Sequence, residues 1–421
     1  MELKEDLKEA KERLNAWWDH EIIDRPTISY YIPKRRGAIG GYLDARCQDW
    51  TLAKNHEDIE KALNGFEKRA NQTYFGGEAI PTYHPNYGPG IAAAVLGVEP
   101  KFESETVWFN RPIEVKNIVS FLEGIKLNNK NEWYSLLLKV TEYAAKRAKG
   151  SYFIAMTDIG GVLDILSFFL GPTQILLTMK RNPEIIDTCR AIILEKILRI
   201  YDKLQTIIEK YVDGCNAWLN IWCKRRWYPV QCDFIAMLNP KWFKRFALPD
   251  IIAQIEHLDY AIYHMDGPYQ IPYLDTYLAI ENLTGIQWVP GAGRVLQGSA
   301  EWMPLYKKIQ KADKNVIIDT LPEFVPHIYN TLDPKGLYVR TFYSSQIAAD
   351  YYLPKFLGGK DGVIINNAVK WCNDNNKLKL EMEDFNLFLK TQNILLENKI
   401  KNMLLKEINI VLKGVLYDTF S

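Results

Sequence analysis

The pattern His264-Met-Asp266 ends an apolar stretch at 260–265 and is the first candidate for chemistry in this chain. Side chains alternate along a strand, so His264 and Asp266 lie on the same face. A histidine beside a carboxylate can ligate a metal ion or transfer protons. The alternative is that Asp266 only orients His264 or caps the following helix. The pattern therefore predicts a catalytic pair, or two ligands of a metal ion, at the end of this strand.

Other polar and aromatic side chains stand at the ends of further predicted strands. His84 and Asp158 stand at two of these strand ends and are candidate catalytic residues. Aromatic and amide side chains at strand ends predict a pocket for a flat substrate, whereas core packing is the alternative for any one of them. The predicted substrate-binding residues of this kind are Tyr83, Tyr87, Trp222, Gln287, Trp288 and Tyr343.

Two basic triplets complete the candidate residues. Lys34-Arg35-Arg36 follows the first predicted strand and Lys224-Arg225-Arg226 follows the fourth, so we expect both to face the same end of the sheet. Arginine forks bind carboxylates or phosphates at two points, which makes Arg35 and Arg36 candidate substrate-binding residues. The alternative is solvated surface charge paired with nearby acids.

The elements that must position these residues are strands and helices in regular alternation. Short strands that are apolar on both faces are typical of a parallel sheet. Eight such strands with intervening helices predict a (β/α)₈ TIM barrel, an α/β fold whose active site lies at the carboxyl ends of its strands. The predicted strands cover 27–32, 78–84, 152–157, 216–222, 260–265, 284–289, 315–319 and 337–342.

Helical patterns occupy most of the remaining chain. We assign residues 1–358 to the barrel, with an N-terminal helical extension before its first strand, and 359–421 to a C-terminal helical appendage rich in Lys, Asn, Glu and Leu. No Gly-rich nucleotide-binding turn occurs in the sequence. The predicted helices cover 2–18, 53–71, 131–148, 162–170, 183–212, 240–257, 270–280, 302–312, 322–330 and 345–356.

Composition narrows the function classes. The 421 residues carry a net charge of +1, so no global basic field favours nucleic acid or a membrane surface as a partner. No uncharged apolar run reaches the about 18 residues of a membrane span, and the charged N-terminus does not resemble a secretory signal. Six scattered cysteines form no C-x-x-C pair. We therefore expect a cytoplasmic protein that acts on a small molecule.

Several segments resemble the uroporphyrinogen decarboxylase superfamily. The residues that carry the resemblance, over roughly residues 20–358, are Asp158-Ile-Gly-Gly161 with the helix that follows, Cys232-Asp-Phe-Ile-Ala-Met-Leu-Asn-Pro240 up to Leu248-Pro249, Tyr263-His-Met-Asp-Gly-Pro268, and Ile286-Gln-Trp-Val-Pro-Gly-Ala-Gly293. The resemblance implies a TIM barrel, an enzyme and a homodimer. This superfamily holds tetrapyrrole decarboxylases and zinc-dependent methyltransferases that exchange methyl groups with corrinoid proteins.

The two branches differ at positions that can be read in this sequence. The methyltransferase branch has His-x-Cys-Gly where this chain has His264-Met-Asp-Gly267, and a later cysteine where it has Thr341-Phe-Tyr-Ser-Ser345. The decarboxylase branch has an Arg-Gln-Ala-Gly-Arg-Tyr type motif where this chain has Pro33-Lys-Arg-Arg-Gly37. The kept histidine favours the methyltransferase branch, and the carboxylate makes any metal site harder than one built from thiolates.

The resemblance thus implies a metal-assisted methyltransferase that uses a corrinoid or a similar methyl donor. Its zinc would be held by His264 and Asp266, with His84 or Asp158 as third ligand or base, and a corrinoid protein would be its partner. One alternative is a metal-independent decarboxylase of a tetrapyrrole or other polycarboxylate, bound by the basic triplets. Another is a non-catalytic barrel that binds a tetrapyrrole or corrinoid.

Overall fold

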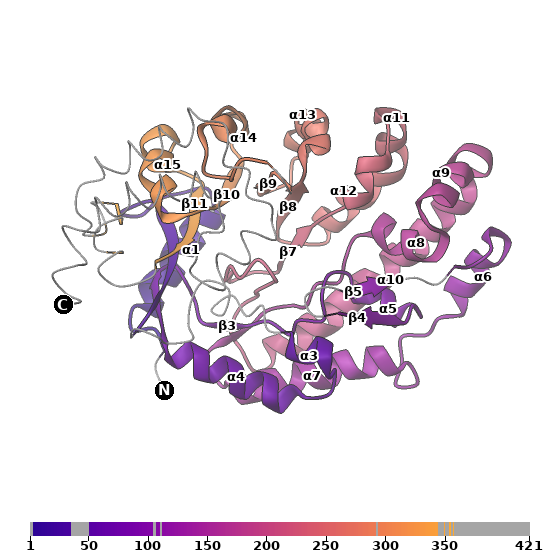
Figure 1. Cartoon of the computed structure of the whole chain (residues 1–421), viewed down its shortest axis with the longest axis horizontal. Helices are drawn as coiled ribbons and strands as arrows, with labels where there is room; N and C mark the ends of the chain where they lie inside the picture. Colours follow the sequence, from indigo (N-terminus) through magenta and orange to yellow (C-terminus); the bar gives the residue numbers. More distant parts are fainter. Residues whose placement is uncertain are drawn as a thin grey trace, which may run out of the picture.

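The chain folds as an α/β protein with a mostly parallel central sheet (Figure 1). The computed structural model describes residues 3–34, 50–103, 107–109, 112–291, 294–343, 349, 353–354 and 357. Arg35, Arg36 and the predicted helical appendage at 359–421 lie outside the described residues, and the predicted helix at 345–356 lies almost wholly outside them.

The central sheet has seven strands in the order β2-β1-β11-β10-β9-β8-β7. All neighbours in it are parallel except β1 and β2, which are antiparallel. The pairing of β1 with β11 joins the first and the last strand of the predicted alternation. These strands are β1 (Thr27–Pro33), β2 (Thr73–Gly77), β7 (Trp227–Val230), β8 (Tyr260–Asp266), β9 (Gly285–Val289), β10 (Asn315–Asp319) and β11 (Leu337–Phe342).

Two further strand pairs lie outside this sheet. The short strands β3 (Thr82–Tyr83) and β6 (Phe153–Ile154) pair in parallel, and a single parallel bridge connects Met156 with Ala217. β4 (Pro100–Phe102) and β5 (Val107–Phe109) form an antiparallel hairpin that the sequence did not predict. The predicted α/β class is confirmed, whereas closure of all the strands into one barrel stays a prediction, because the described strands fall into separate sheets.

The predicted strand at 216–222 is wrong. Its apolar residues are buried as a strand would require, but Asn220 takes a left-handed conformation with φ of 57° and turns the chain. Cys215 and Cys223 exchange two backbone hydrogen bonds of 2.8 and 2.9 Å and close the segment into a loop, called here the 214–223 loop. The strand that joins the sheet is β7, directly after this loop.

Helices pack along the outside of the sheet. In Figure 1, α12, α13, α14 and α15 follow one another outside β7 to β11, and α4 and α7 run along the opposite side of the molecule. The helices are α1 (Leu7–Trp18), α3 (Thr51–Lys54), α4 (Ile59–Asn71), α5 (Ala92–Val95), α6 (Val115–Gly124), α7 (Glu132–Ala148), α8 (Val162–Leu170), α9 (Pro172–Arg181), α10 (Pro183–Glu209), α11 (Pro240–Trp242), α12 (Leu248–Glu256), α13 (Leu274–Leu278), α14 (Met303–Lys311) and α15 (Val325–Thr331).

Several predicted helices are interrupted or change helix type. The stretch at 53–71 is divided into α3 and α4. The stretch at 240–257 contains a π-helical turn at Phe243–Ala247, and the stretch at 270–280 begins as a 3₁₀ helix at Pro268–Tyr273. Further 3₁₀ turns are Asp233–Met237, Ala300–Trp302 and Pro322–Phe324. Within the described part of the chain, no single helix is long and apolar enough to cross a membrane. Only α8 and α9 taken together, with a bend of 101° between them, have the length and composition of a span.

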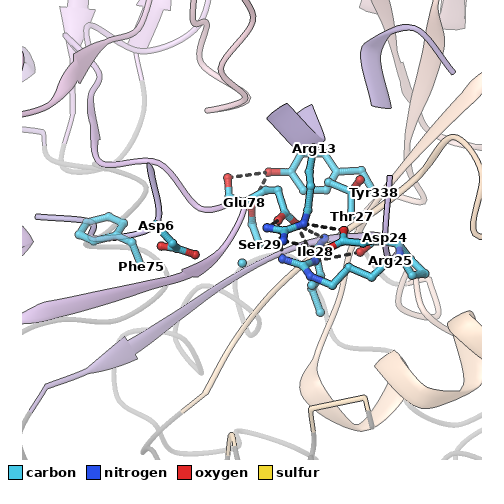
Figure 2. Close-up of polar contacts among 12 residues, drawn as sticks. Asp6, Arg13, Asp24, Arg25, Thr27, Ile28, Ser29, Phe75, Glu78 and Tyr338 are labelled. Carbon is cyan, nitrogen blue, oxygen red and sulfur yellow. Dashed lines mark hydrogen bonds and ion pairs between the residues drawn. The ribbon is translucent and has the colours of Figure 1, made fainter. Parts of the chain in front are cut away.

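A buried ion-pair network lies at the amino end of β1 and the carboxyl end of the antiparallel β2 (Figure 2). The Glu78 side chain is fully buried, and both of its oxygens accept from the Arg25 guanidinium, at 3.0 and 2.6 Å. The Ile28 backbone N–H donates to the same carboxylate at 2.8 Å. Burial raises the pKa of Glu78, and the Arg25 charge opposes that rise. In the same network, Arg13 of α1 forms ion pairs with Asp24 at 2.8 Å and with Glu78 at 3.6 Å. The network ties the N-terminal helix to the sheet.

Candidate active site

The centre of the candidate site is His264, near the carboxyl end of β8. Its half-buried ring stands opposite Gln287 of β9 in the strand register. His264 Nδ1 lies 2.5 Å from Gln287 Oε1, a short hydrogen bond between the two side chains. The direct pairing of two parallel strands therefore sets the orientation of the imidazole.

The hydrogen bonding continues across two more strands. Gln287 Nε2 donates to Asp319 Oδ2 of β10 at 2.9 Å, and Arg340 Nη2 of β11 donates to the same oxygen at 2.6 Å. Gln287, Asp319 and Arg340 are only 4%, 6% and 2% exposed. The charges of Asp319 and Arg340 are therefore buried together. Buried charges persist in proteins when they are paired and hydrogen-bonded, as here. We call His264, Gln287, Asp319 and Arg340 the relay.

The relay decides which nitrogen of His264 carries the proton. Asp319 pairs with the Arg340 guanidinium and, as a carboxylate, can only accept hydrogen bonds. Gln287 must therefore turn its NH₂ group to Asp319 and its carbonyl oxygen to His264. That oxygen accepts, so His264 Nδ1 is the protonated nitrogen. The lone pair of neutral His264 then lies on Nε2, on the side of the ring away from the relay.

Several carboxylates surround His264. Asp266 ends the same strand, Asp158 lies in the loop after β6, and Asp233 begins the 3₁₀ turn after β7. Burial raises the pKa of Asp158 to about 6, and the nearby His264 works in the opposite direction. Burial likewise raises the pKa of Asp266, again opposed by His264 and reinforced by Asp233. Asp158 and Asp266 therefore both interact electrostatically with His264.

A fourth carboxylate belongs to the same group. Asp164 lies in the first turn of α8 and accepts from the backbone N–H groups of Phe234 and Asp233, at 2.7 and 3.1 Å. Its pKa is raised to about 7, first by burial and then by the negative charge of Asp233. A carboxyl with a pKa near neutrality can both hold and release a proton at physiological pH.

Glycines bring the Asp158 loop close to its neighbours. Gly160 has φ of +84°, and a Cβ there would stand 2.7 Å from the Cα of Gly90. The Gly160 N–H donates to Asp158 at 2.8 Å, and the Tyr228 hydroxyl accepts from the Ile159 N–H at 2.8 Å. The loops after β3 and β6 therefore touch backbone to backbone, which only glycine allows.

The 214–223 loop places one aromatic side chain against His264. The half-buried Trp218 stands edge-on to His264, with ring centroids 5.1 Å apart and an interplanar angle of 84°. Asn216 Nδ2 donates to Thr82 Oγ1 at 2.9 Å, and Arg340 Nη1 donates to the Leu219 carbonyl oxygen. Segments far apart in the sequence thus meet at His264.

The structure brings four of the predicted residues together: Asp158, His264, Asp266 and Gln287. Electrostatic interactions connect Asp158 and Asp266 with His264, and Gln287 is hydrogen-bonded to it. His84 directly follows β3, as expected from the sequence, and is half-buried. The predicted roles of all five residues stay predictions.

The predicted aromatic residues are packed into the interior. Tyr83 stands edge-on to Phe66, Trp288 stands edge-on to Trp302, and Tyr343 stands edge-on to Tyr30, at centroid distances of 5.5, 5.0 and 5.7 Å. The Tyr87 hydroxyl donates to the His56 carbonyl oxygen at 3.1 Å. These contacts favour core packing over the lining of a substrate pocket.

Trp222 and the second basic triplet lie at the opposite end of the sheet from His264. The Trp222 indole donates to the Asp213 carbonyl oxygen at 3.0 Å, and its own carbonyl accepts from Trp18 of α1 at 2.9 Å. Arg226 precedes β7 and pairs with Glu209 at 2.8 Å. The expectation that Lys224–Arg226 faces the site is wrong, because the true strand follows the triplet instead of preceding it.

The predicted zinc site does not fit the described side chains. Among the residues that the structure describes, no three His, Cys, Asp or Glu side chains form a group that could hold a metal ion. A catalytic zinc needs three protein ligands. His264 and Asp266 would supply two of them.

Sequence reasoning missed Trp218, Arg340, Asp164 and Asp233. Arg340 lies inside a strand, where a charged residue between Val339 and Thr341 was the available signal, because a buried arginine needs a partner. Trp218 was read as part of a strand that does not exist. The two aspartates lie within segments that carried the family resemblance, but their separation of 69 residues hides their contact.

Comparison with known proteins gives one clear finding. No protein-family model matches the sequence, and no curated protein is significantly similar to it. A methyltransferase from Methanosarcina mazei superimposes with a TM-score of 0.53, over 87% of this chain and 98% of its own, at 12% sequence identity. The chain shares the fold of this methyltransferase. Because few residues are identical, the chemistry has to be argued from the site itself.

Proposed function

We propose that the chain is a methyltransferase whose reacting group is His264. The observation that carries this proposal is the relay, which holds the imidazole with Nδ1 protonated and Nε2 as the basic nitrogen. The overall fold, similar to that of a methyltransferase along nearly the whole of both chains, supports the reaction type.

Methyl transfer to a thiol or another acidic nucleophile requires the acceptor to lose a proton. His264 Nε2 takes this proton, and Asp158 and Asp266 stabilise the imidazolium that results. The acceptor then forms the new bond to the methyl carbon with its own electron pair. The donor keeps both electrons of the bond that breaks, which suits a methylated corrinoid as donor. No metal ion is needed for the proton transfer.

Trp218 suits the proposed chemistry as well. An indole beside the reacting imidazole excludes water from one side of it, and water exclusion strengthens charge interactions within a site. Asp158 and Asp266 are close enough to act on His264 electrostatically.

The proposal is tested with methylcobalamin as the methyl donor and a panel of small thiols as acceptors. Heterolysis of the cobalt–carbon bond gives cob(I)alamin, which is followed by its absorbance, and the methyl thioether is measured by mass spectrometry. We expect turnover by the purified chain, and a fall of about 10²- to 10⁴-fold in His264→Gln.

His257→Gln is the matched control. His257 ends α12 and pairs with Asp202 at 2.9 Å, so this variant loses a histidine without touching the relay. Unchanged turnover in His264→Gln would contradict the proposal. Release of CO₂ from a tetrapyrrole polycarboxylate without methyl transfer would replace it with a decarboxylase. Tight corrinoid binding without any turnover would replace it with a binding protein.

A further inference from the structure

Arg340 makes two contacts that lead to two different neighbours of His264. Its Nη2 donates to Asp319, the far end of the hydrogen-bond chain that reaches His264 Nδ1. Its Nη1 donates to the carbonyl oxygen of Leu219, the residue next to Trp218. One buried guanidinium therefore joins the side chain that orients the imidazole to the loop that covers it.

We propose that Arg340 is a positioning residue that sets both the tautomer of His264 and the place of Trp218 against its ring. The proposal rests on the proposed function only in taking His264 as the reacting group. Arg340 is 2% exposed and lies on β11, so it acts on His264 through Asp319 and Gln287.

The first effect of Arg340 concerns hydrogen-bond direction. A buried carboxyl without a cation holds its proton, and a protonated carboxyl can donate as well as accept. The Arg340 charge keeps Asp319 as an acceptor, so Gln287 has one orientation and His264 has its proton on Nδ1. Without the guanidinium, Gln287 can turn over, and the proton of His264 can move to Nε2, the nitrogen that has to accept.

The second effect concerns the 214–223 loop. The loop is closed at its base by the backbone pair Cys215–Cys223 and held on one flank by Asn216. Near its tip, Arg340 holds the Leu219 carbonyl, and Asn220 contacts the Tyr31 hydroxyl at 3.4 Å. Loss of the Arg340 contact releases the backbone on the carboxyl side of Trp218. The indole then no longer has a fixed position beside His264.

The two effects are measured by nuclear magnetic resonance on the full chain with ¹⁵N-labelled histidine and tryptophan. The His264 signals are assigned by their loss in His264→Gln and the Trp218 signal by its loss in Trp218→Phe. In the unaltered protein we expect one neutral tautomer, protonated at Nδ1. In Arg340→Met we expect a mixed or reversed tautomer and a shifted, broadened Trp218 indole signal.

Two further variants separate a positioning role from general destabilisation. Gln287→Leu breaks the relay but keeps the Arg340–Leu219 contact, so the Nδ1–H tautomer is lost while the Trp218 signal stays. Arg190→Met removes another buried arginine, which pairs with Asp250 through two bonds of 2.8 Å. This variant loses a comparable ion pair, and we expect the His264 and Trp218 signals to stay unchanged.

If Arg340→Met does not fold, Arg340→Lys replaces it. Lysine keeps the charge beside Asp319 but lacks the fork, so the Nδ1–H tautomer is retained and the Trp218 signal moves. An unchanged His264 tautomer in Gln287→Leu, or in Arg340→Met where it folds, overturns the proposal, and so does an unmoved Trp218 signal in Arg340→Lys. These signals need no turnover, so an inactive protein with the Nδ1–H tautomer would refute the methyltransferase and leave this inference intact.

Discussion

His264 Nδ1 and Gln287 Oε1 lie 2.5 Å apart on two adjacent parallel strands, at positions directly opposite in the register. Because strand register fixes this pair, neither side chain needs a flexible loop to find the other. A reacting group held by rigid elements is preorganised, which lowers the cost of reaching the productive geometry. The same pair explains why the charge of Arg340, on β11, can affect the imidazole.

Replacing Asp158 by asparagine should stabilise the protein increasingly as the pH rises. The pKa of Asp158 is raised from 3.8 to about 6, so the folded state holds the proton more tightly than the unfolded state. The stabilisation from this group is present below about pH 4 and is lost as the pH rises through about 6. Ionisation at neutral pH therefore costs up to roughly 3 kcal/mol. Asp158→Asn removes that cost, while its amide oxygen still accepts from Gly160.

The measurement is urea denaturation of both proteins at about pH 4.5 and about pH 7.5. Asp158→Asn also removes a negative charge that raises the pKa of Asp164, so the difference between variant and parent includes this second contribution, which has the same sign. Asp24→Asn is a control in which the stability change should depend on pH with the opposite sign, because the hydrogen bond from Arg13 lowers the pKa of Asp24. A stability difference for Asp158→Asn that does not grow with pH would contradict the burial of an ionisable group there.

Removing Arg25 should destabilise the protein far more than removing Arg13. Arg25→Met leaves the buried Glu78 carboxylate without its two-point partner, which costs about 3–5 kcal/mol. Arg13→Met removes a pair with the half-exposed Asp24, worth about 0–1 kcal/mol. Denaturation midpoints of the two variants give the comparison. Equal losses would mean that the network in Figure 2 does not depend on the buried carboxylate.

Gly160→Ala should lower both stability and activity. Both Gly160 and Gly150 have positive φ, at +84° and +81°, so alanine at either position costs about 1–2 kcal/mol in backbone strain. Only at Gly160 does the new Cβ also meet backbone, the Cα of Gly90 at 2.7 Å; at Gly150 nothing lies within 4 Å. Thermal denaturation and turnover are compared for the two variants. Similar behaviour of both would show that the close approach of the two loops is unimportant.

Four cysteines should resist alkylation in the native protein. Cys189, Cys215, Cys223 and Cys232 are buried, and burial raises the pKa of each thiol, to about 12 for Cys189 and Cys215. The thiolate is the reactive form, so iodoacetamide at about pH 8 should leave these residues unmodified until denaturant is added. Peptide mass spectrometry reads the result. Rapid native labelling of any of the four would place a thiolate among the candidates for chemistry.

Much of the fold follows from local patterns. Runs such as Asn315–Asp319 are apolar on both faces, which predicts a buried parallel strand, and the structure confirms it. The same rule failed at 216–222, because burial alone does not distinguish a strand from a loop that fills the interior. The left-handed turn at Asn220 combines a residue type that tolerates this conformation with a local backbone bond to Ala217 and a contact with the distant Tyr31.

The sequence by itself determined that His264 and Asp266 share a face at a strand end, because strand periodicity is a local property. It also associated Asp158 and Gln287 with two further strands, which the structure places before Asp158 and around Gln287. Only the tertiary structure decided that Gln287 bonds His264, that Asp319 and Arg340 continue the chain, and that Trp218 stands against the imidazole. The physical reason is register. Which side chains meet across neighbouring strands, and which loop fills the space between them, depends on pairings between segments as far apart as Leu219 and Arg340, 121 residues along the chain.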